Sequence, residues 1–317
     1  MQKNLNKVES KFDDKLGIHD MRLAQIKQVL KLFTLCTTFF LSLTFALNAN
    51  AHDHGHNDHE SPVMGLQLYS LRNQMAEDTK QALAYVKKWG INAVEGGGML
   101  HGKSLMDFKA LLEEHDIEIV SVDTSFEEMR DNPMGAAYKA HYYGAKYATI
   151  YWVPHNGDIG FTIDDANATI KVLNEGGKVL KEHGITLQYH PHGYELTEYQ
   201  DGTLLDHIIQ NVTEADIQMD VFWIKQGGGN PVEILRKYEG RFTSLHLKDR
   251  LPGSPNSSTG SADVETNVVL GDGDVGISEV IKEARKQGIK YYFIEDESSR
   301  VLTQIPKSIQ YIKPQLQ

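Results

Sequence analysis

The stretch that decides the fold runs from Ile185 to Leu196 and reads ITLQYHPHGYEL. Its first half has the apolar and β-branched character of a buried strand, and two histidines, His190 and His192, follow at its end. Because successive strand residues point to opposite faces, these two histidines share one face. The segment therefore predicts a buried strand that leads into a polar site.

Three later segments repeat this design, since each is an apolar run that leads into a side chain able to bind a metal ion. They are IQMDVFW (217–223) with Asp220, FTSLHLKD (242–249) with His246, and YYFIEDE (291–297) with Glu295. If four such strand ends converge, His190 and these three side chains surround one point. Imidazole and carboxylate donors suit manganese, iron, cobalt, zinc or magnesium. The pattern therefore predicts one divalent metal ion.

From Val63 onward, strand-like runs alternate with amphipathic helix-like runs about eight times, as in parallel strands joined by helices. Candidate strands cover 65–71, 91–96, 117–123, 147–153, 185–190, 216–222, 242–247 and 290–295, and candidate helices cover 78–90, 104–116, 136–144, 162–184, 203–212, 230–240, 276–288 and 306–312. The expected fold is a single α/β (β/α)8 TIM barrel over residues 63–317. A doubly wound open sheet is the alternative, but no glycine-rich dinucleotide motif follows the first strand.

The longest irregular connection, residues 250–276, follows the seventh candidate strand and is rich in Gly, Ser, Pro and Asp. A connection of this length in a compact domain is usually a lid or a binding loop. The alternative is an insertion without function.

Residues 1–51 have the features of a secretory signal peptide, with Met21 as an alternative start. A basic segment up to Lys31 precedes the apolar run 32–47, and small residues at 49–51 provide a cleavage site after about Ala51. An uncleaved membrane anchor is the alternative, although the run is shorter than the roughly 20 residues that span a bilayer. We therefore expect a periplasmic or secreted protein.

A His- and Asp-rich tract, HDHGHNDHE (52–60), follows the predicted cleavage site. Such a tract can hold a transition metal loosely, or it can be a solvated, flexible linker over 52–62 with no essential role. Cys36 is the only cysteine and lies within the predicted signal peptide. The mature chain would therefore have neither a disulfide nor a cysteine nucleophile.

The mature chain is predicted to be strongly acidic. The whole sequence has a net charge of -11, and removal of residues 1–51 leaves 25 Lys and Arg against 39 Asp and Glu, a net charge of -14. Such a protein repels nucleic acid and anionic membrane surfaces. We expect neither as a partner after signal cleavage, whereas an oligomer is compatible with the sequence.

The site segments resemble those of the xylose isomerase-like TIM barrel superfamily, which includes the sugar phosphate isomerase/epimerase family. The resemblance rests on HLKD (246–249), the acid Asp220, IEDE (294–297) and YHPHGYE (189–195), and it extends from about Val63 to the C-terminus. It implies a barrel enzyme that acts on sugars.

In that family a Glu, Asp, His, Glu set at strands five to eight binds one divalent metal, which implies His190, Asp220, His246 and Glu295 here. His190 departs from the pattern, because many members carry glutamate at this position. In the ketose epimerases the two glutamates act on opposite faces of the substrate. The departure puts a symmetric two-glutamate mechanism in doubt.

A metal bound to the oxygens of an α-hydroxyketone stabilises the enediolate that forms when the carbon between them loses its proton. Glu295 is the expected base, and His192 and Lys248 are candidate acids and bases for the second step, which decides between epimerisation, isomerisation and elimination. Alternatively, His192 orients His190, and Lys248 binds a phosphate or hydroxyl group or forms an ion pair with Asp249 or another acid.

Other polar and aromatic residues near strand ends are predicted to line the pocket. The expected substrate-binding residues are Tyr69, Arg72, Glu95, Trp152, His155, Asp249 and Glu297, and Asp123 is expected nearby. Aromatic faces suit sugar rings, although Tyr69 and Trp152 could instead cap the barrel core.

Export narrows the substrate class, because phosphorylated sugars are made and used inside cells, while free sugars and glycosides occur outside. The predicted function is an exported, divalent-metal-dependent isomerase or epimerase that acts through a metal-stabilised enediolate on a free sugar or keto-sugar. A 3-keto-glycoside lyase or hydratase is the alternative enzyme. A non-catalytic carbohydrate-binding barrel is the alternative of another class, and it would not need four metal ligands.

Overall fold

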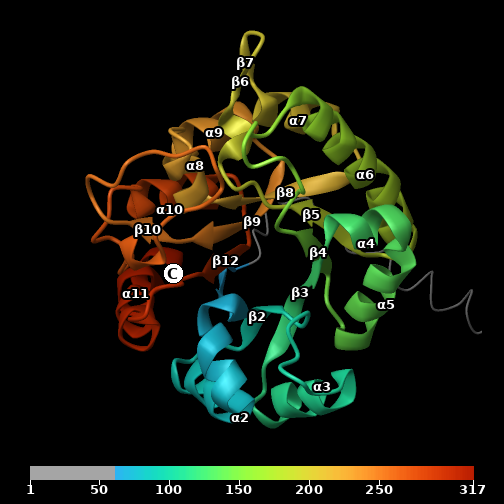
Figure 1. Cartoon of the computed structure of the whole chain (residues 1–317). Helices are drawn as coiled ribbons and strands as arrows, with labels where there is room; N and C mark the ends of the chain where they lie inside the picture. The colour runs from blue at the N-terminus through green and yellow to red at the C-terminus, as the bar shows by residue number, and fades with distance from the viewer. Residues whose placement is uncertain (1–60) are drawn as a thin grey trace, which may run out of the picture. The chain divides into compact units, whose positions relative to one another are not determined.

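The computed structural model describes residues 61–317, which form a closed barrel of eight parallel strands surrounded by helices (Figure 1). In order around the barrel, the strands are β1 (Val63–Gln67), β2 (Ala93–Gly96), β3 (Glu118–Thr124), β4 (Tyr147–Ile150), β5 (Thr186–Tyr189), β8 (Ala215–Asp220), β9 (Phe242–Leu247) and β12 (Tyr291–Ile294). Pairing of β12 with β1 closes the sheet. The predicted TIM barrel is confirmed, while the predicted signal peptide (1–51) and nearly all of the linker (52–62) lie outside the described residues.

The helices cover the outside of the barrel (Figure 1). They are α2 (Arg72–Lys88), α3 (Leu105–Glu114), α4 (Phe126–Asp131), α5 (Pro133–Tyr143), α6 (Ile163–Glu182), α7 (Leu204–Asn211), α8 (Val221–Gln226), α9 (Pro231–Lys237), α10 (Ile277–Lys286) and α11 (Val301–Leu316). The short helices α4 and α8 are absent from the sequence prediction. Within residues 61–317, no helix combines the length and apolar character needed to cross a membrane.

Three predicted strands end at least two residues earlier than expected, and one of them, 147–153, ends at Ile150. The first candidate, 65–71, becomes β1 followed by a 3-10 helix, η1 (Leu68–Leu71), because the Gln67 side chain accepts a hydrogen bond from the Tyr69 amide. The sixth, 216–222, ends at Asp220, whose side chain caps α8. Both turns bend the chain at the C-terminal end of the barrel, where the predicted site residues lie.

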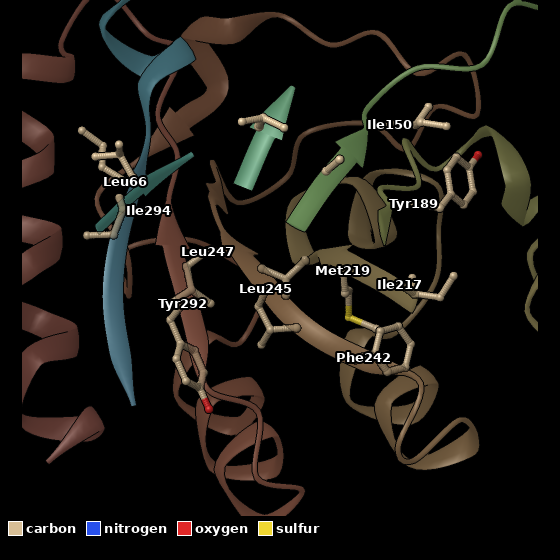
Figure 2. Packing of buried hydrophobic residues seen from close by; sticks show 14 of the residues in the cluster. Leu66, Ile150, Tyr189, Ile217, Met219, Phe242, Leu245, Leu247, Tyr292 and Ile294 are labelled. Atoms are coloured by element: carbon tan, nitrogen blue, oxygen red, sulfur yellow. The ribbon is translucent and has the colours of Figure 1, made fainter. Parts of the chain in front are cut away.

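Alternate residues of the strands face outward and form the main core against the helices. Figure 2 shows part of this layer, including Leu66, Met219, Leu245 and Ile294, all of which are buried. A smaller cluster of Ala93, Val120, Tyr291 and Phe293 is also buried. In β12, Tyr291 and Phe293 alternate with Tyr292 and Ile294 of the main core, so the smaller cluster fills the barrel interior.

A layer of polar side chains lies on the same inward-facing strand positions. Thr149 bonds to Ser121 at 2.7 Å and to Gln188 at 3.0 Å, and both Gln188 and Gln218 donate to Ser244 at 2.9 Å. These residues are buried and mutually hydrogen-bonded, which offsets the cost of burying polar groups. The network gives the strand ends a rigid support.

Candidate active site

The four predicted metal ligands lie at the C-terminal ends of consecutive strands. His190 directly follows β5, Asp220 ends β8, His246 is the penultimate residue of β9, and Glu295 directly follows β12. Asp220 is paired in register with His246. The structure therefore brings together the residues that the sequence predicted to converge.

These side chains are close enough to share one cation. Asp220 Oδ2 lies 3.6 Å from His190 Nε2 and 4.0 Å from His246 Nδ1, and Glu295 Oε2 lies 3.1 Å from His246 Nδ1. Donors that bind one cation at about 2.1 Å lie roughly 3 to 4 Å apart. Asp220 Oδ2 is buried without a hydrogen-bond partner among residues 61–317, a costly state that a cation would relieve. His190, Asp220 and His246 thus form a group that can hold a metal ion, with Glu295 beside it.

Hydrogen bonds fix the orientation of His190. Gln218 uses its amide nitrogen to donate to Glu95 and Ser244, so its Oε1 is the acceptor for His190 Nδ1 at 2.9 Å. Nδ1 therefore carries the hydrogen, and Nε2 keeps a lone pair on the side of Asp220. The sequence suggested His192 for this orienting role, but the residue that performs it is Gln218.

His246 is held between two carboxylates. Its Nε2 bonds to Glu95, while its Nδ1 faces Glu295. Burial lowers the pKa of His246, but Glu95 and Glu295 outweigh that effect and raise it to about 10. Because the hydrogen on Nε2 is held by Glu95, Nδ1 is the atom that would give up its proton to bind a cation.

The two carboxylates of the group respond differently to their surroundings. Burial raises the pKa of Asp220, although Lys248 opposes the shift. Burial also acts to raise the pKa of Glu295, but Lys248 and His246 outweigh it and hold this pKa well below its usual range. Asp220 Oδ1 is committed to the N–H groups of Phe222 and Trp223 at the start of α8, which leaves Oδ2 for the cation.

Lys248 is buried next to this group. Its Nζ pairs with Glu297 and lies 3.9 Å from Glu295 Oε2. The ion pair with Asp249 or another acid that the sequence suggested for Lys248 is therefore formed with Glu297. The same ammonium lies 4.9 Å from the Phe222 ring centre and 5.2 Å from that of Trp223, within the range of cation–π attraction.

A cavity of about 430 Å³ opens over the metal-binding group. The predicted residues that line it are Tyr69, Asp123, Trp152, His190, His192, His246, Glu295 and Glu297. Its walls also include Gln67, His101, Tyr151 and Trp223. Tyr69 and Trp152 are 42% and 46% exposed, so these two rings lie at the mouth rather than in the barrel core.

Four other predicted substrate-binding residues have structural partners. Glu95 is fully buried and orients His246 and Gln218 from below. Asp249 accepts hydrogen bonds from the backbone N–H groups of Gly271, Gly273 and Val275. These contacts assign both carboxylates a supporting role in place of the predicted contact with substrate.

Arg72 and His155 likewise support the cavity wall. The Arg72 guanidinium lies over the Tyr69 ring and donates to the Glu297 backbone oxygen at 2.9 Å. His155 packs on Trp152 and bonds to the Val153 carbonyl oxygen at 2.8 Å. Both therefore position predicted lining residues.

The connection predicted as a lid or a binding loop, residues 250–276, borders the cavity. Its base is fixed by pairing of β10 (Asp249–Arg250) with β11 (Asn267–Val268) and by the ion pair of buried Arg250 with Asp274. Gly260 of this connection lines the cavity. The connection therefore contributes to the wall of the cavity, and its role as a lid or a binding loop stays a prediction.

Sequence reasoning missed Gln218, Trp223 and His101. Gln218 and Asp220 are two residues apart in a strand and share a face, so strand alternation could have identified Gln218. Trp223 directly follows the predicted strand 216–222 and lies in α8. His101 adopts a positive φ of 48° in the glycine-rich connection after β2, a conformation for which the sequence offers no clear signal.

Comparisons with known proteins agree with this geometry. The model of the family described as xylose isomerase-like TIM barrel matches residues 83–315. An inosose dehydratase from Clostridium botulinum is 25% identical over 197 residues, which cover 55% of this chain and 64% of that protein. The chain therefore spans less than two thirds of that relative's length.

Solved structures share the fold. A sugar phosphate isomerase/epimerase from Parabacteroides distasonis has a TM-score of 0.67 and 23% identity, with 81% of this chain and 100% of that chain covered. A probable 3-DHS dehydratase from Bacillus anthracis has a TM-score of 0.60 and 14% identity, with 80% and 98% covered. The eight-stranded barrel, the polar ends of its last four strands and the family match together establish that this chain belongs to the xylose isomerase-like TIM barrel family.

Proposed function

We propose that this protein is an exported, divalent-metal-dependent isomerase or epimerase that removes a proton next to the carbonyl group of a free sugar or keto-sugar. The observation that carries the proposal is the unpartnered Asp220 Oδ2 beside His190 and His246, two histidines whose far nitrogens are held by hydrogen bonds to Gln218 and Glu95. Glu295 completes the proposed ligand set. A divalent cation held there would supply Lewis acidity, which favours loss of a proton next to a carbonyl group.

The chain's own groups supply the proton transfers in this proposal. Glu295 is ionised, because Lys248 and His246 lower its pKa, and is therefore able to accept a proton. Burial lowers the pKa of His192 to about 3, so its ring is neutral. The His192 Nδ1 lies 3.4 Å from the His190 backbone oxygen, which leaves Nε2 as the nitrogen that can exchange a proton within the cavity.

The experiment compares wild-type protein with His246→Ala and Glu295→Gln. We expect both variants to fold, to lose bound manganese or zinc measured by elemental analysis, and to lose deuterium incorporation from D2O into sugar substrates measured by NMR. Full metal content and full exchange in both variants would contradict the proposal. Sugar binding without exchange in wild-type protein would favour the non-catalytic binding barrel.

A 3-keto-glycoside lyase or hydratase is the second candidate, and it is favoured by His190. With a histidine where many family members carry glutamate, only Glu295 remains of the two-glutamate pair, and elimination needs a single base on the substrate carbon. The similarity to an inosose dehydratase points the same way. Release of an alcohol from a 3-keto-glycoside would favour the lyase, whereas deuterium exchange without loss of a group would favour the isomerase or epimerase.

A further inference from the structure

A second, smaller cavity of about 200 Å³ adjoins the first one. The two cavities share Trp223, Gly260 and Glu297 as lining residues. The walls of the second cavity come from α8, from the end of β9 and from the loop that follows it. The connection 250–276 thus helps to line two adjoining cavities, of which only the first is lined by residues of the metal-binding group.

The polar groups of this side cavity are fixed in place. Lys248 is 1% exposed and is held by Glu297 and by the rings of Phe222 and Trp223. Asn267 is 2% exposed, and its side-chain oxygen accepts a hydrogen bond from the Glu297 amide at 2.9 Å. The Asn267 amide nitrogen has no hydrogen-bond partner within the described part of the chain, so it is free to donate to a ligand.

These groups match the chemistry of a hydroxyl-bearing ring. An ammonium group and an amide nitrogen donate hydrogen bonds, a carboxylate accepts them, and the Phe222 and Trp223 rings offer apolar faces for C–H groups. The Lys248 ammonium lies 3.9 Å from Glu295 Oε2. Because Glu295 lines the first cavity and Lys248 the second, a ligand whose reacting part lies at Glu295 would have its next unit beside the side cavity.

We propose that this side cavity binds the second unit of a two-unit carbohydrate, so that the substrate is a glycoside or disaccharide rather than a monosaccharide. The inference rests on the proposed function, because the reacting unit at the metal-binding group determines where the second unit lies. It assigns Lys248, Asn267 and Glu297 to the recognition of that second unit.

The test fills the side cavity without changing the first one. Ala262 lines only the side cavity, and Ala262→Trp would occupy it; Ser261→Trp is a second variant of the same design. Ser258→Trp is the matched control, because Ser258 is an exposed residue of the same loop. Thermal unfolding and metal content verify that each variant is intact.

Affinities are measured by calorimetry in the presence of manganese for paired probes: glucose with cellobiose, maltose and sophorose, xylose with xylobiose, and galactose with lactose. In at least one pair we expect the two-unit sugar to bind about tenfold tighter than its single unit, the gain expected from a few added hydrogen bonds. Ala262→Trp and Ser261→Trp should abolish this difference, and Ser258→Trp should preserve it. Equal affinities within every pair, including the absence of binding, would overturn the inference, as would an unchanged preference in both filling variants.

The outcome is separable from that of the proposed function. Metal content and deuterium exchange report on the metal-binding group alone, whereas the ratio of the paired affinities reports on the side cavity alone. In one outcome, wild-type protein shows no deuterium exchange and yet binds a two-unit sugar more tightly than its single unit, with the difference lost in Ala262→Trp. That result would refute the isomerase or epimerase and would still support the second binding site.

Discussion

Glu95 shows how a residue below the site controls the ligands above it. Its two carboxylate oxygens accept hydrogen bonds from His246 and Gln218. In Glu95→Gln one of these oxygens becomes an NH2 group, which must face another N–H donor in either orientation of the amide. We expect metal affinity to fall by about 10- to 100-fold while the barrel remains folded, as for other residues that orient metal ligands.

Metal titration with a competing chelator measures this effect. Glu118→Gln provides the control, because Glu118 is exposed at the other end of a neighbouring strand. An affinity in Glu95→Gln equal to that of the control would show that the carboxylate is not needed to orient His246.

Asp123 makes the stability of the folded state depend on pH. It lines the cavity, where burial raises its pKa from 3.8 to about 6 against the hydrogen bond from the Gly98 amide. In the folded state it therefore holds its proton to higher pH than in the unfolded state, so its contribution to stability is full below about pH 4 and is lost as the pH rises through about 6.

Asp123→Asn removes this titration and retains an oxygen for Gly98. We expect the metal-free variant to be more stable than wild type by about 1 to 3 kcal/mol at pH 8, with no advantage at pH 4. Urea unfolding at both pH values measures the difference. A constant difference between pH 4 and pH 8 would contradict the assignment.

Among single residues, the sequence predicted the proposed metal ligands better than the residues that orient them through hydrogen bonds. His190, Asp220, His246 and Glu295 follow apolar runs and carry metal-binding groups, so strand alternation was enough to identify them. Glu95 has the same local pattern, yet it lies beneath the site. Its role depends on contacts with residues more than 100 positions away, which a local pattern does not encode.

Helix α6 illustrates an element whose sequence is explained only by its packing. It contains Gly176 and Gly177, although glycine weakens a helix interior by about 1 kcal/mol relative to alanine. A Cβ atom at Gly177 would lie 2.1 Å from the Glu214 backbone oxygen. The glycine thus allows the helix to approach the chain just before β8, the strand that carries Asp220.

Gly177→Ala should therefore destabilise the protein by about 1 to 3 kcal/mol, despite its better helix propensity, because the backbone must move apart. Gly176→Ala is the matched comparison, since the nearest atom there, at 2.5 Å, is the mobile end of the Met129 side chain. Denaturant unfolding should show the larger loss for Gly177→Ala. Equal or greater stability of this variant would contradict the packing argument.

Element boundaries were predicted well where the pattern ends at a clear signal. The strand 242–247 matches β9, and the predicted helix 162–184 contains α6, which begins after a capping box at Thr162. The first two residues of α8, Val221 and Phe222, were assigned to a strand, because a short apolar run does not distinguish a strand from a helix. The hydrogen bonds that cap the start of α8 are accepted by the side chain of Asp220, a residue also predicted as a metal ligand.

The stability of the whole barrel should depend on whether the metal is bound. The proposed ligands come from four consecutive strands or their ends, including β12, which closes the barrel against β1. Without a cation, Asp220 and Glu295 are buried near each other, and the repulsion between their carboxylates opposes folding. A cation that binds only the folded barrel adds about 2.7 kcal/mol to the free energy of unfolding at a concentration 100 times its Kd. This gain corresponds to a rise in Tm of roughly 5 to 10 °C for a domain of this size.

Thermal unfolding after EDTA treatment, followed by return of manganese, zinc or magnesium, measures the shift in Tm, and His246→Ala should abolish it. Equal Tm values for stripped and metal-treated wild-type protein would mean that the folded barrel does not bind the added metals in preference to the unfolded chain.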